Sequence, residues 1–268
     1  MSKIIDTVTF FNENFIYDLR YNVIKDYVDY LVVCESKFDH KGNPKKLRFN
    51  YEKYSSSKKI KYIVLEQPFP KNNNPWKNQA IQREYLLKNL NFASDEDYIF
   101  FSDPDEIPNP KILTNFILKK KYGIFLQKNY NLKFNYFNPH ESPWDGPRVS
   151  KKKDLKSIDY IRQKVWSKNL KYKFYRIDKE KNIQLFDNGG WHFNNMLKPE
   201  DISLKLKTFA HTEYSGEFFS SIDKIKENIN KGVDLFNRGY KFKKVEIDET
   251  FPEYLVKNKE IYKDFIIK

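Results

Sequence analysis

Short apolar runs alternate with amphipathic segments over the first 120 residues, and this alternation constrains the fold more than any other feature. The runs 30–34, 60–65 and 98–101 are nearly continuous in apolar residues, which is typical of strands buried on both faces of a sheet. Between them, segments 15–25 and 79–90 repeat apolar residues at helical spacing. Strands that alternate with helices predict an α/β fold with a mostly parallel central sheet flanked by helices.

The second half of the chain is less regular and predicts a mixture of strands, loops and helices. Residues 123–137 have a strand-like pattern, and 142–150 predict a loop because they contain two prolines and a glycine. A turn at 187–190 leads into 191–193. Helices are expected over 199–209 and 222–231, in addition to one over 110–120 that closes the first half. We expect residues 1–268 to form one domain, in which this mixed half completes a cleft begun by the α/β half.

The composition excludes several classes of protein. The chain contains 23 Phe and 19 Tyr, which supply a large core and exclude a disordered chain. No apolar run approaches the ~20 residues that span a bilayer, and the N-terminus does not resemble a signal peptide. The single cysteine, Cys34, fits a reducing compartment. We therefore expect a cytoplasmic protein.

The formal net charge of +13 raises the question of an anionic partner. The lysines are spread along the chain and form no basic block, so a general bias in composition explains most of them. A nucleic-acid-binding protein stays an alternative, although the chain has no RNP-type or zinc-finger motif. An anionic membrane surface or a phosphorylated substrate are the other partners that this charge would suit.

Two aspartates that directly follow the apolar run 98–101 are the sharpest chemical feature. Asp103 and Asp105 are one residue apart, within Asp-Pro-Asp-Glu. Ligands of open α/β sheets bind at the carboxyl ends of the strands, and carboxylate oxygens are the ligands that Mg²⁺ and Mn²⁺ prefer beside substrate phosphates. The pair predicts a site for a divalent cation, and a solvated acidic turn is the alternative.

Three further segments carry candidate side chains. His192 follows paired glycines and is a candidate metal or phosphate ligand, with a structural histidine as the alternative. Residues 205–213 bring Lys205, His211 and Glu213 to the end of an expected helix, where a solvated helix end is the alternative. In 144–148, Trp144 offers an aromatic platform and Arg148 a guanidinium, although an ordinary surface turn would explain both.

A set of short segments in fixed order resembles glycosyltransferase family 17. The matching segments are Phe10-Phe11-Asn12-Glu13, Leu19-Arg20, Val28-Asp29, 32–36, Gly42-Asn43-Pro44, 47–49, Gln82-Arg83, 103–108, 190–193, Lys205-Leu206, 252–255 and Lys257-Asn258. They cover nearly the whole chain, so the ordered set is specific although each segment alone is weak. The resemblance implies a GT-A-like fold, a nucleotide-sugar donor, with UDP-N-acetylglucosamine as the first candidate, and inversion at the anomeric carbon. Residues 1–120 would bind the nucleotide sugar, and 121–268 would form the acceptor side.

The resemblance also implies roles for individual residues. The metal ligands would be Asp103, Asp105 and His192, with Mn²⁺ or Mg²⁺ as the ion. The donor-binding residues would be Glu13, Glu35, Arg83, Asp103, Arg148 and Lys205. Inversion needs a base that deprotonates the acceptor hydroxyl; Glu213 is the first candidate and Asp145 the second.

The acceptor class follows from the family and from the absence of an anchor in the sequence. We expect a glycan hydroxyl on a cell-surface glycan, a lipid-linked saccharide or a small sugar, and a bacterial or viral source. An anionic membrane surface is a further expected partner, and nucleic acid is not expected. A catalytically inactive sugar-binding relative is the alternative within the family.

Overall fold

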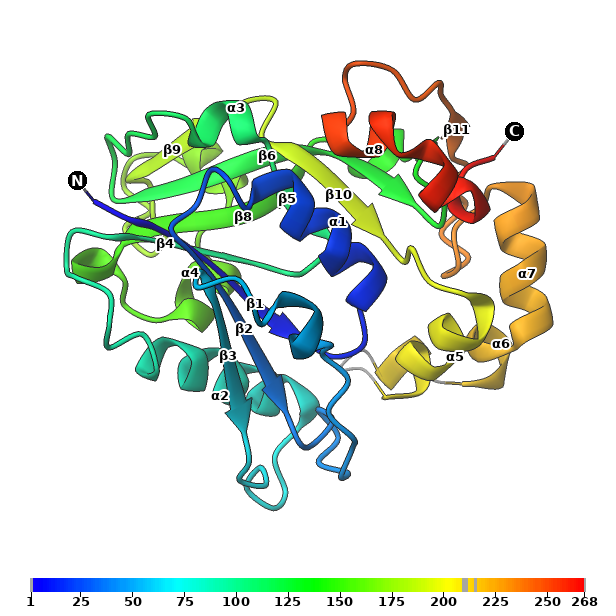
Figure 1. Cartoon of the computed structure of the whole chain (residues 1–268), viewed down its shortest axis with the longest axis horizontal. Helices are drawn as coiled ribbons and strands as arrows, with labels where there is room; N and C mark the ends of the chain where they lie inside the picture. Colours follow the sequence, from blue (N-terminus) through cyan, green and yellow to red (C-terminus); the bar gives the residue numbers. More distant parts are fainter. Residues whose placement is uncertain (1, 209–211, 215, 268) are drawn as a thin grey trace.

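The protein, seen in a computed structural model that describes residues 2–208, 212–214 and 216–267, is built on a sheet of 11 strands flanked by helices (Figure 1). The strands are β1 (Ile4–Phe10), β2 (Tyr30–Ser36), β3 (Ile60–Leu65), β4 (Tyr98–Ser102), β5 (Glu106–Pro108), β6 (Tyr122–Asn131), β7 (Tyr136–Phe137), β8 (Trp144–Lys151), β9 (Ile183–Phe186), β10 (Gly190–Asn194) and β11 (Lys243–Lys244). The main path through the sheet is β11-β7-β6-β8-β4-β1-β2-β3. The predicted α/β fold is confirmed.

Helices and short 3-10 turns connect these strands. The α-helices are α1 (Asn14–Ile24), α2 (Pro75–Lys88), α3 (Pro110–Leu113), α4 (Ile158–Lys164), α5 (Pro199–Thr208), α6 (Glu217–Ser220), α7 (Ile222–Lys231) and α8 (Glu253–Lys257). The 3-10 turns are η1 (Tyr51–Tyr54), η2 (Pro139–Glu141), η3 (Lys152–Asp154), η4 (Ser167–Lys171), η5 (Thr212–Tyr214) and η6 (Lys259–Phe265). Within the described residues, no helix combines the length and apolarity needed to cross a bilayer.

The first half forms a parallel unit in which β3, β2, β1 and β4 lie side by side. The strands and helices expected up to residue 102 are confirmed, with boundaries shifted by a few residues. The largest shift is in α2, which begins at Pro75 rather than at residue 79. The side chain of Asn74 accepts a hydrogen bond from the backbone N–H of Lys77, and Pro75 fits the first helical position.

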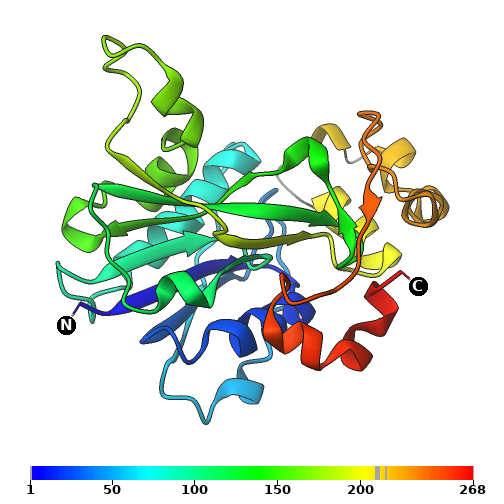
Figure 2. The same cartoon turned by 90° about the horizontal axis from the view of Figure 1, so that it is seen from above.

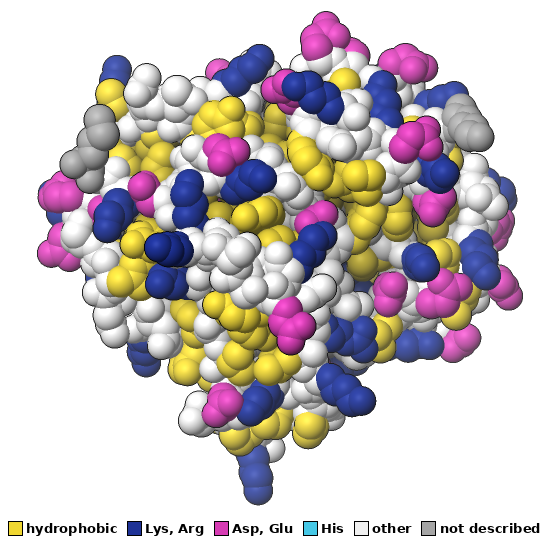
Figure 3. Space-filling model, in the orientation of Figure 1, with side chains coloured by type: hydrophobic (Ala, Val, Ile, Leu, Met, Phe, Trp, Pro, Cys, Tyr) yellow, Lys and Arg dark blue, Asp and Glu magenta, His cyan; other side chains and the backbone are white. Residues whose placement is uncertain are grey.

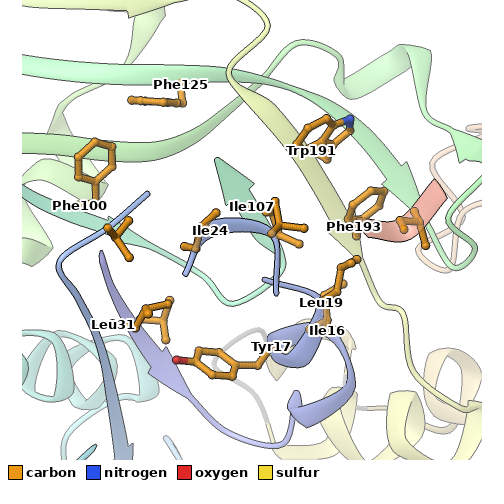
Figure 4. Packing of buried hydrophobic residues seen from close by; sticks show 14 of the residues in the cluster. Ile16, Tyr17, Leu19, Ile24, Leu31, Phe100, Ile107, Phe125, Trp191 and Phe193 are labelled. Atoms are coloured by element: carbon orange, nitrogen blue, oxygen red, sulfur yellow. The ribbon is translucent and has the colours of Figure 1, made fainter. Parts of the chain in front are cut away.

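Successive residues of these strands point to opposite faces of the sheet. One face packs in a cluster with α1 and α8, and Figure 4 shows Ile16 and Leu19 of α1 near Phe193 of β10. The other face, which includes Cys34, packs against α2 and α4. Burial on both faces explains why the strands of the first half have continuous apolar sequences.

The predicted loop at 142–150 is wrong, because the structure places strand β8 there. β8 is antiparallel to β4 on one side and to β6 on the other. Its register against β6 shifts between Ile124 and Leu126, so Gly146 and Pro147 lie at an irregularity in the ladder. Proline is tolerated at such a bulge because no ladder hydrogen bond is lost there.

The predicted helix at 110–120 is also wrong over most of its length. Helix α3 ends at Leu113, and Asn115 adopts a left-handed backbone with φ of 55°. A single left-handed residue stops a right-handed helix. The expected helices at 199–209 and 222–231 are confirmed as α5, which is described as far as Thr208, and α7.

Strand β10, which belongs to the second half, pairs with strand β5 of the first half. It is parallel to β6 and antiparallel to β5, and His192 lies opposite Glu106 in this pairing. Gly190 begins the strand with φ of 125°, and a Cβ there would lie 2.1 Å from the carbonyl oxygen of Ile107. Only glycine permits so close an approach of the two backbones.

Candidate active site

A cleft of about 480 Å³ lies at the carboxyl ends of β1, β2 and β4. Residues that follow these strands line it from the first half, and residues of β10, α5 and the chain beyond α7 line it from the second half. This position is where open α/β sheets bind ligands.

The loop that carries Asp103 and Asp105 is held by an arginine from α4. Arg162 contacts Asp103 Oδ2 with Nη2 at 2.7 Å and both carboxylate oxygens of Glu106 at 2.5 and 2.9 Å. Burial opposes ionisation of Asp103, but Arg162 and the nearby Arg83, His192 and Lys205 together outweigh it and hold the pKa of Asp103 at about 2. Asp103 is therefore a carboxylate at neutral pH, and its half-buried side chain faces the cleft.

A second, buried arginine also supports the loop that carries Asp103 and Asp105. Arg20 of α1 is fully buried and pairs with Asp6 of β1. It also donates hydrogen bonds of 2.7 Å to Ser102 Oγ and to the carbonyl oxygen of Glu106. Each buried charge of this network has a partner, which is the condition under which buried ion pairs are tolerated. We call Asp6, Arg20, Ser102, Glu106 and Arg162 the floor of the cleft.

Asp105 and His192 lie next to each other on the cleft wall. His192 Nε2 is 3.7 Å from Asp105 Oδ1, and the backbone N–H of Phe193 donates to the carbonyl oxygen of Asp105 at 2.9 Å. Burial opposes both charges, yet their mutual attraction lowers the pKa of Asp105 and raises that of His192. The indole of Trp144 stacks on the His192 ring with centroids 4.7 Å apart and fixes its orientation.

Asp105 and His192 provide a partial donor set for a metal ion. In the described part of the chain, no group of three or more His, Cys, Asp or Glu side chains converges as a metal site. The Nδ1 atom of His192 is buried and finds no hydrogen-bond partner among these residues. One carboxylate and one imidazole fit an ion that takes its remaining ligands from a substrate and water.

Glu13 and Lys205 also line the cleft, from opposite halves of the chain. Glu13 follows β1, and its Oε2 accepts hydrogen bonds from the backbone N–H groups of Phe11 and Asn12 at 2.9 Å. Burial raises the pKa of Glu13, and nearby Lys205 opposes that rise. Lys205 of α5 contacts Asn195 Oδ1 at 3.2 Å. The structure therefore brings these two candidates into one cleft with the Asp103 loop.

Arg83 lines the cleft from α2, but most of its guanidinium is buried. Its Nη1 contacts Asp159 Oδ1 at 2.9 Å, and its guanidinium lies 5.6 Å from the ring centroid of Phe101. Burial lowers the pKa of Arg83, and Asp103 opposes that effect. The sequence predicted that Arg83 points toward the Asp103 loop; its direct carboxylate partner in the structure is Asp159 of α4.

Three candidate residues lie in the structure behind the cleft instead of lining it. Glu35 is fully buried and accepts hydrogen bonds from Lys45, Tyr62 and the backbone N–H groups of 48 and 49. Arg148 is buried under the Trp166 ring and donates to the carbonyl oxygens of residues 145 and 146. Asp145 Oδ2 accepts from the backbone N–H of Ser167 at 2.8 Å. These contacts hold the segments around the cleft in place.

The last two candidates are Glu213 and His211, at the end of the expected helix 199–209. Glu213 is exposed on η5, and its neighbour Tyr214 lines the cleft. His211 lies outside the described residues.

Sequence reasoning gave no role to the residues of the floor, of which Glu106 and Arg162 hold the Asp103 loop. Glu106 is adjacent to Asp105 and belongs to the same acidic motif, so its position was available as a signal. Arg162 is far from that motif in the chain, and no local pattern marks it.

The charges that line the cleft are balanced. Of the described residues that line it, five are acidic and five are basic, namely Glu13, Asp39, Asp103, Asp105 and Glu141 against Lys45, Arg83, Arg162, Lys205 and Arg238. Figure 3 likewise shows Lys and Arg dispersed among Asp and Glu on one face of the molecule. Among the described residues that line the cleft, the basic side chains form no continuous patch of the kind that binds nucleic acid.

Comparison with known proteins gives a family but no near relative. No curated protein matches the sequence. Among solved structures, a protein assigned as a glucose-1-phosphate thymidylyltransferase from Bacillus anthracis, crystallised with sucrose, matches with a TM-score of 0.36 and 11% identity over 70% of this chain and 87% of its own. A glycosyltransferase involved in glycosylation of the major capsid of PBCV-1 matches with a TM-score of 0.29 and 12% identity over 69% and 81%. Likenesses this weak support no conclusion.

The family model for glycosyltransferase family 17 matches residues 1–266, which is nearly the whole chain. The match agrees with the ordered sequence segments and with a cleft at the carboxyl ends of β1, β2 and β4. The chain belongs to glycosyltransferase family 17 and is a glycosyltransferase.

Proposed function

We propose that this glycosyltransferase is metal-dependent and inverting, and that it transfers N-acetylglucosamine from UDP-N-acetylglucosamine to a glycan hydroxyl. The observation that carries the proposal is the convergence of Asp103, Asp105 and His192 on one cleft at the carboxyl ends of β1, β2 and β4. The strand order β3-β2-β1-β4, followed by antiparallel β8, supports a GT-A-like arrangement.

The charge balance of the cleft supports the need for a cation. Five acidic and five basic side chains among the described residues leave no net positive charge to attract a diphosphate, and Arg162 is already engaged by Asp103 and Glu106. Asp105 and His192 would hold Mn²⁺ or Mg²⁺. The ion would supply a Lewis acid that offsets the charge on the departing diphosphate.

The other residues of the cleft would bind and orient the donor. Asp103, kept ionised by Arg162 and the other nearby positive charges, presents a hydrogen-bond acceptor suited to a ribose hydroxyl. Lys205 provides a positive charge for the diphosphate from the second half. Glu13, at the end of β1, lies along the same wall as Asp105 and would contact the nucleotide.

The base that deprotonates the acceptor hydroxyl is assigned to Glu213. Its side chain is exposed, and the adjacent Tyr214 lines the cleft. Asp145, the second candidate, accepts a hydrogen bond from Ser167 and does not line the cleft, which counts against it. Glu141 lines the cleft and takes its place as the alternative.

Titration calorimetry with UDP and a panel of nucleotide sugars, with and without Mn²⁺, tests the proposal. We expect Mn²⁺-dependent binding of UDP and UDP-N-acetylglucosamine that is lost in Asp105→Ala and kept in the matched exposed variant Asp264→Ala. Preference for another nucleotide sugar would overturn the donor assignment alone. Nucleotide binding that does not change with Mn²⁺ would overturn the proposed metal dependence.

Turnover separates an enzyme from an inactive relative. Donor binding without release of UDP, in the presence of saccharide acceptors, would favour a sugar-binding protein. Binding to heparin or DNA that falls steeply with salt, in the absence of UDP binding, would favour the nucleic-acid alternative.

A further inference from the structure

Residues 166–182 project from the body of the protein as a loop that we call the finger (Figure 2, yellow-green, upper left). It leaves the fold after the fully buried Val165 and returns at Ile183 of β9. At its base, the backbone N–H of Ser167 donates to Asp145, and Asn169 Nδ2 donates to the carbonyl oxygen of Lys164 at 2.7 Å. The base of the finger is therefore anchored in the fold.

The tip of the finger carries large apolar side chains that the fold does not cover. Phe174 is 91% exposed and Ile177 is 96% exposed, with Tyr175 at 58% between them. Ring contacts at the tip are local, such as Phe174 against Tyr175 at 5.7 Å. Apolar groups gathered at an exposed tip mark an interaction surface, because they contribute nothing to the core.

Basic side chains surround this apolar tip. The finger contains Lys168, Lys171, Lys173, Arg176, Lys179 and Lys181 against Asp178 and Glu180, which gives a net charge of +4. Several cations lie over its aromatic rings, including Arg176 at 5.3 Å and Lys179 at 5.5 Å from the centroid of Tyr172. Positive charge and aromatic rings thus share one surface with the apolar tip.

We propose that the finger docks the protein on a lipid bilayer with anionic headgroups. Phe174 and Ile177 would enter the boundary between headgroups and acyl chains, and the lysines would pair with the headgroups around them. The charge argues against self-association through this surface, because two fingers with a net charge of +4 each would repel one another. Ile177 argues against nucleic acid, because an aliphatic side chain offers no ring on which a base can stack.

Docking would also orient the cleft. Trp166 at the base of the finger lines the cleft, so a docked finger holds the cleft near the membrane surface. This consequence rests on the proposed transfer reaction and favours a lipid-linked saccharide as acceptor. Lipid binding itself is measured without donor or acceptor, so the docking proposal and the proposed function fail separately.

Co-sedimentation of the full chain with vesicles tests the docking. We expect binding to vesicles of equimolar phosphatidylcholine and phosphatidylglycerol, weak binding to pure phosphatidylcholine, and a loss of binding as salt rises. Phe174→Ser with Ile177→Ser should weaken binding at least about tenfold, as should Lys171→Glu with Lys173→Glu. The matched pair Phe218→Ser with Ile261→Ser, which removes exposed apolar groups elsewhere, should bind like the unaltered protein.

Urea unfolding of each variant checks that the fold is intact, since exposed substitutions should leave the midpoint unchanged. The proposal is overturned if the unaltered protein ignores the anionic vesicles, or if both finger variants bind them normally. It is also overturned if the finger substitutions abolish self-association measured by light scattering, or binding of single-stranded RNA, and leave vesicle binding in place.

Discussion

The floor of the cleft and its rim differ in burial. The floor consists of buried side chains that bond to one another. The rim consists of partly exposed side chains on α5, on η5 and beyond α7, namely Lys205, Tyr214, Phe236 and Arg238. In the floor, Arg20 and Glu106 are fully buried, and each has charged or carbonyl partners. The rim is held by contacts closer to the surface, such as Arg238 with Glu141. The difference indicates that the floor holds a fixed geometry, whereas the rim has more freedom to change.

Removing Arg20 should give the largest effect on the floor. Arg20→Ala leaves the buried Asp6 without its partner and removes the hydrogen bonds to Ser102 and Glu106, so we expect a loss of about 3–5 kcal/mol in the free energy of unfolding. Urea denaturation measures it. The exposed ion pair of Arg176 with Asp178 is the control, and Arg176→Ala should leave the midpoint where it is. Equal effects of the two variants would contradict the comparison.

At the rim, Glu213→Gln should separate activity from stability. If Glu213 is the base, turnover falls by roughly 10²–10⁴-fold, while the urea midpoint and UDP binding stay the same because the side chain is exposed. Steady-state assays of UDP release measure the first effect. Glu217→Gln, on the neighbouring helix α6, is the matched control. Near-normal turnover in Glu213→Gln would exclude this residue and direct attention to Glu141.

Gly190 tests the join between the two halves. In Gly190→Ala, the new methyl group would meet the carbonyl oxygen of Ile107 and the residue would keep φ near 125°, so we expect about 1–3 kcal/mol of destabilisation. Thermal unfolding measures this loss. Gly216→Ala is the control, because a Cβ there meets nothing within 4 Å and its φ of −66° suits alanine. An equally large fall in stability in Gly216→Ala would contradict the inference that position 190 specifically requires glycine.

The thiol of Cys34 reports on the packing behind the floor and gives the smallest expected signal. Burial raises its pKa to about 12, so the folded protein should react very slowly with iodoacetamide at about pH 8 and quickly once unfolded in urea. Mass spectrometry of the alkylated protein measures the rate. Arg20→Ala should increase the rate of Cys34 alkylation, because a destabilised protein unfolds more often. Glu213→Gln should leave that rate unchanged. Rapid labelling of the unaltered protein would show that this side of the sheet is open.

Sequence patterns identified those parts of the molecule whose cause is local. The run 98–101 with Asp103 and Asp105 predicted both a strand and the position of the loop, because burial on both faces leaves a continuous apolar signal. Strand β8 was missed because Pro147 and Gly146 resemble loop residues until β6 is known to shift its register beside them. Arg162 was missed because its partners are distant in the chain.

The pairing of β10 with β5 has a consequence for how the protein is made. Asp105 leaves the ribosome well before His192, and Gly190 must then bring β10 against a segment that has already been synthesised. The first half can form its parallel strands early, but the cleft wall that holds Asp105 is incomplete until β10 brings His192 beside it. A nascent chain that stops short of residue 190 would therefore carry the aspartates without the histidine, and the cleft would be completed only after the second half has emerged.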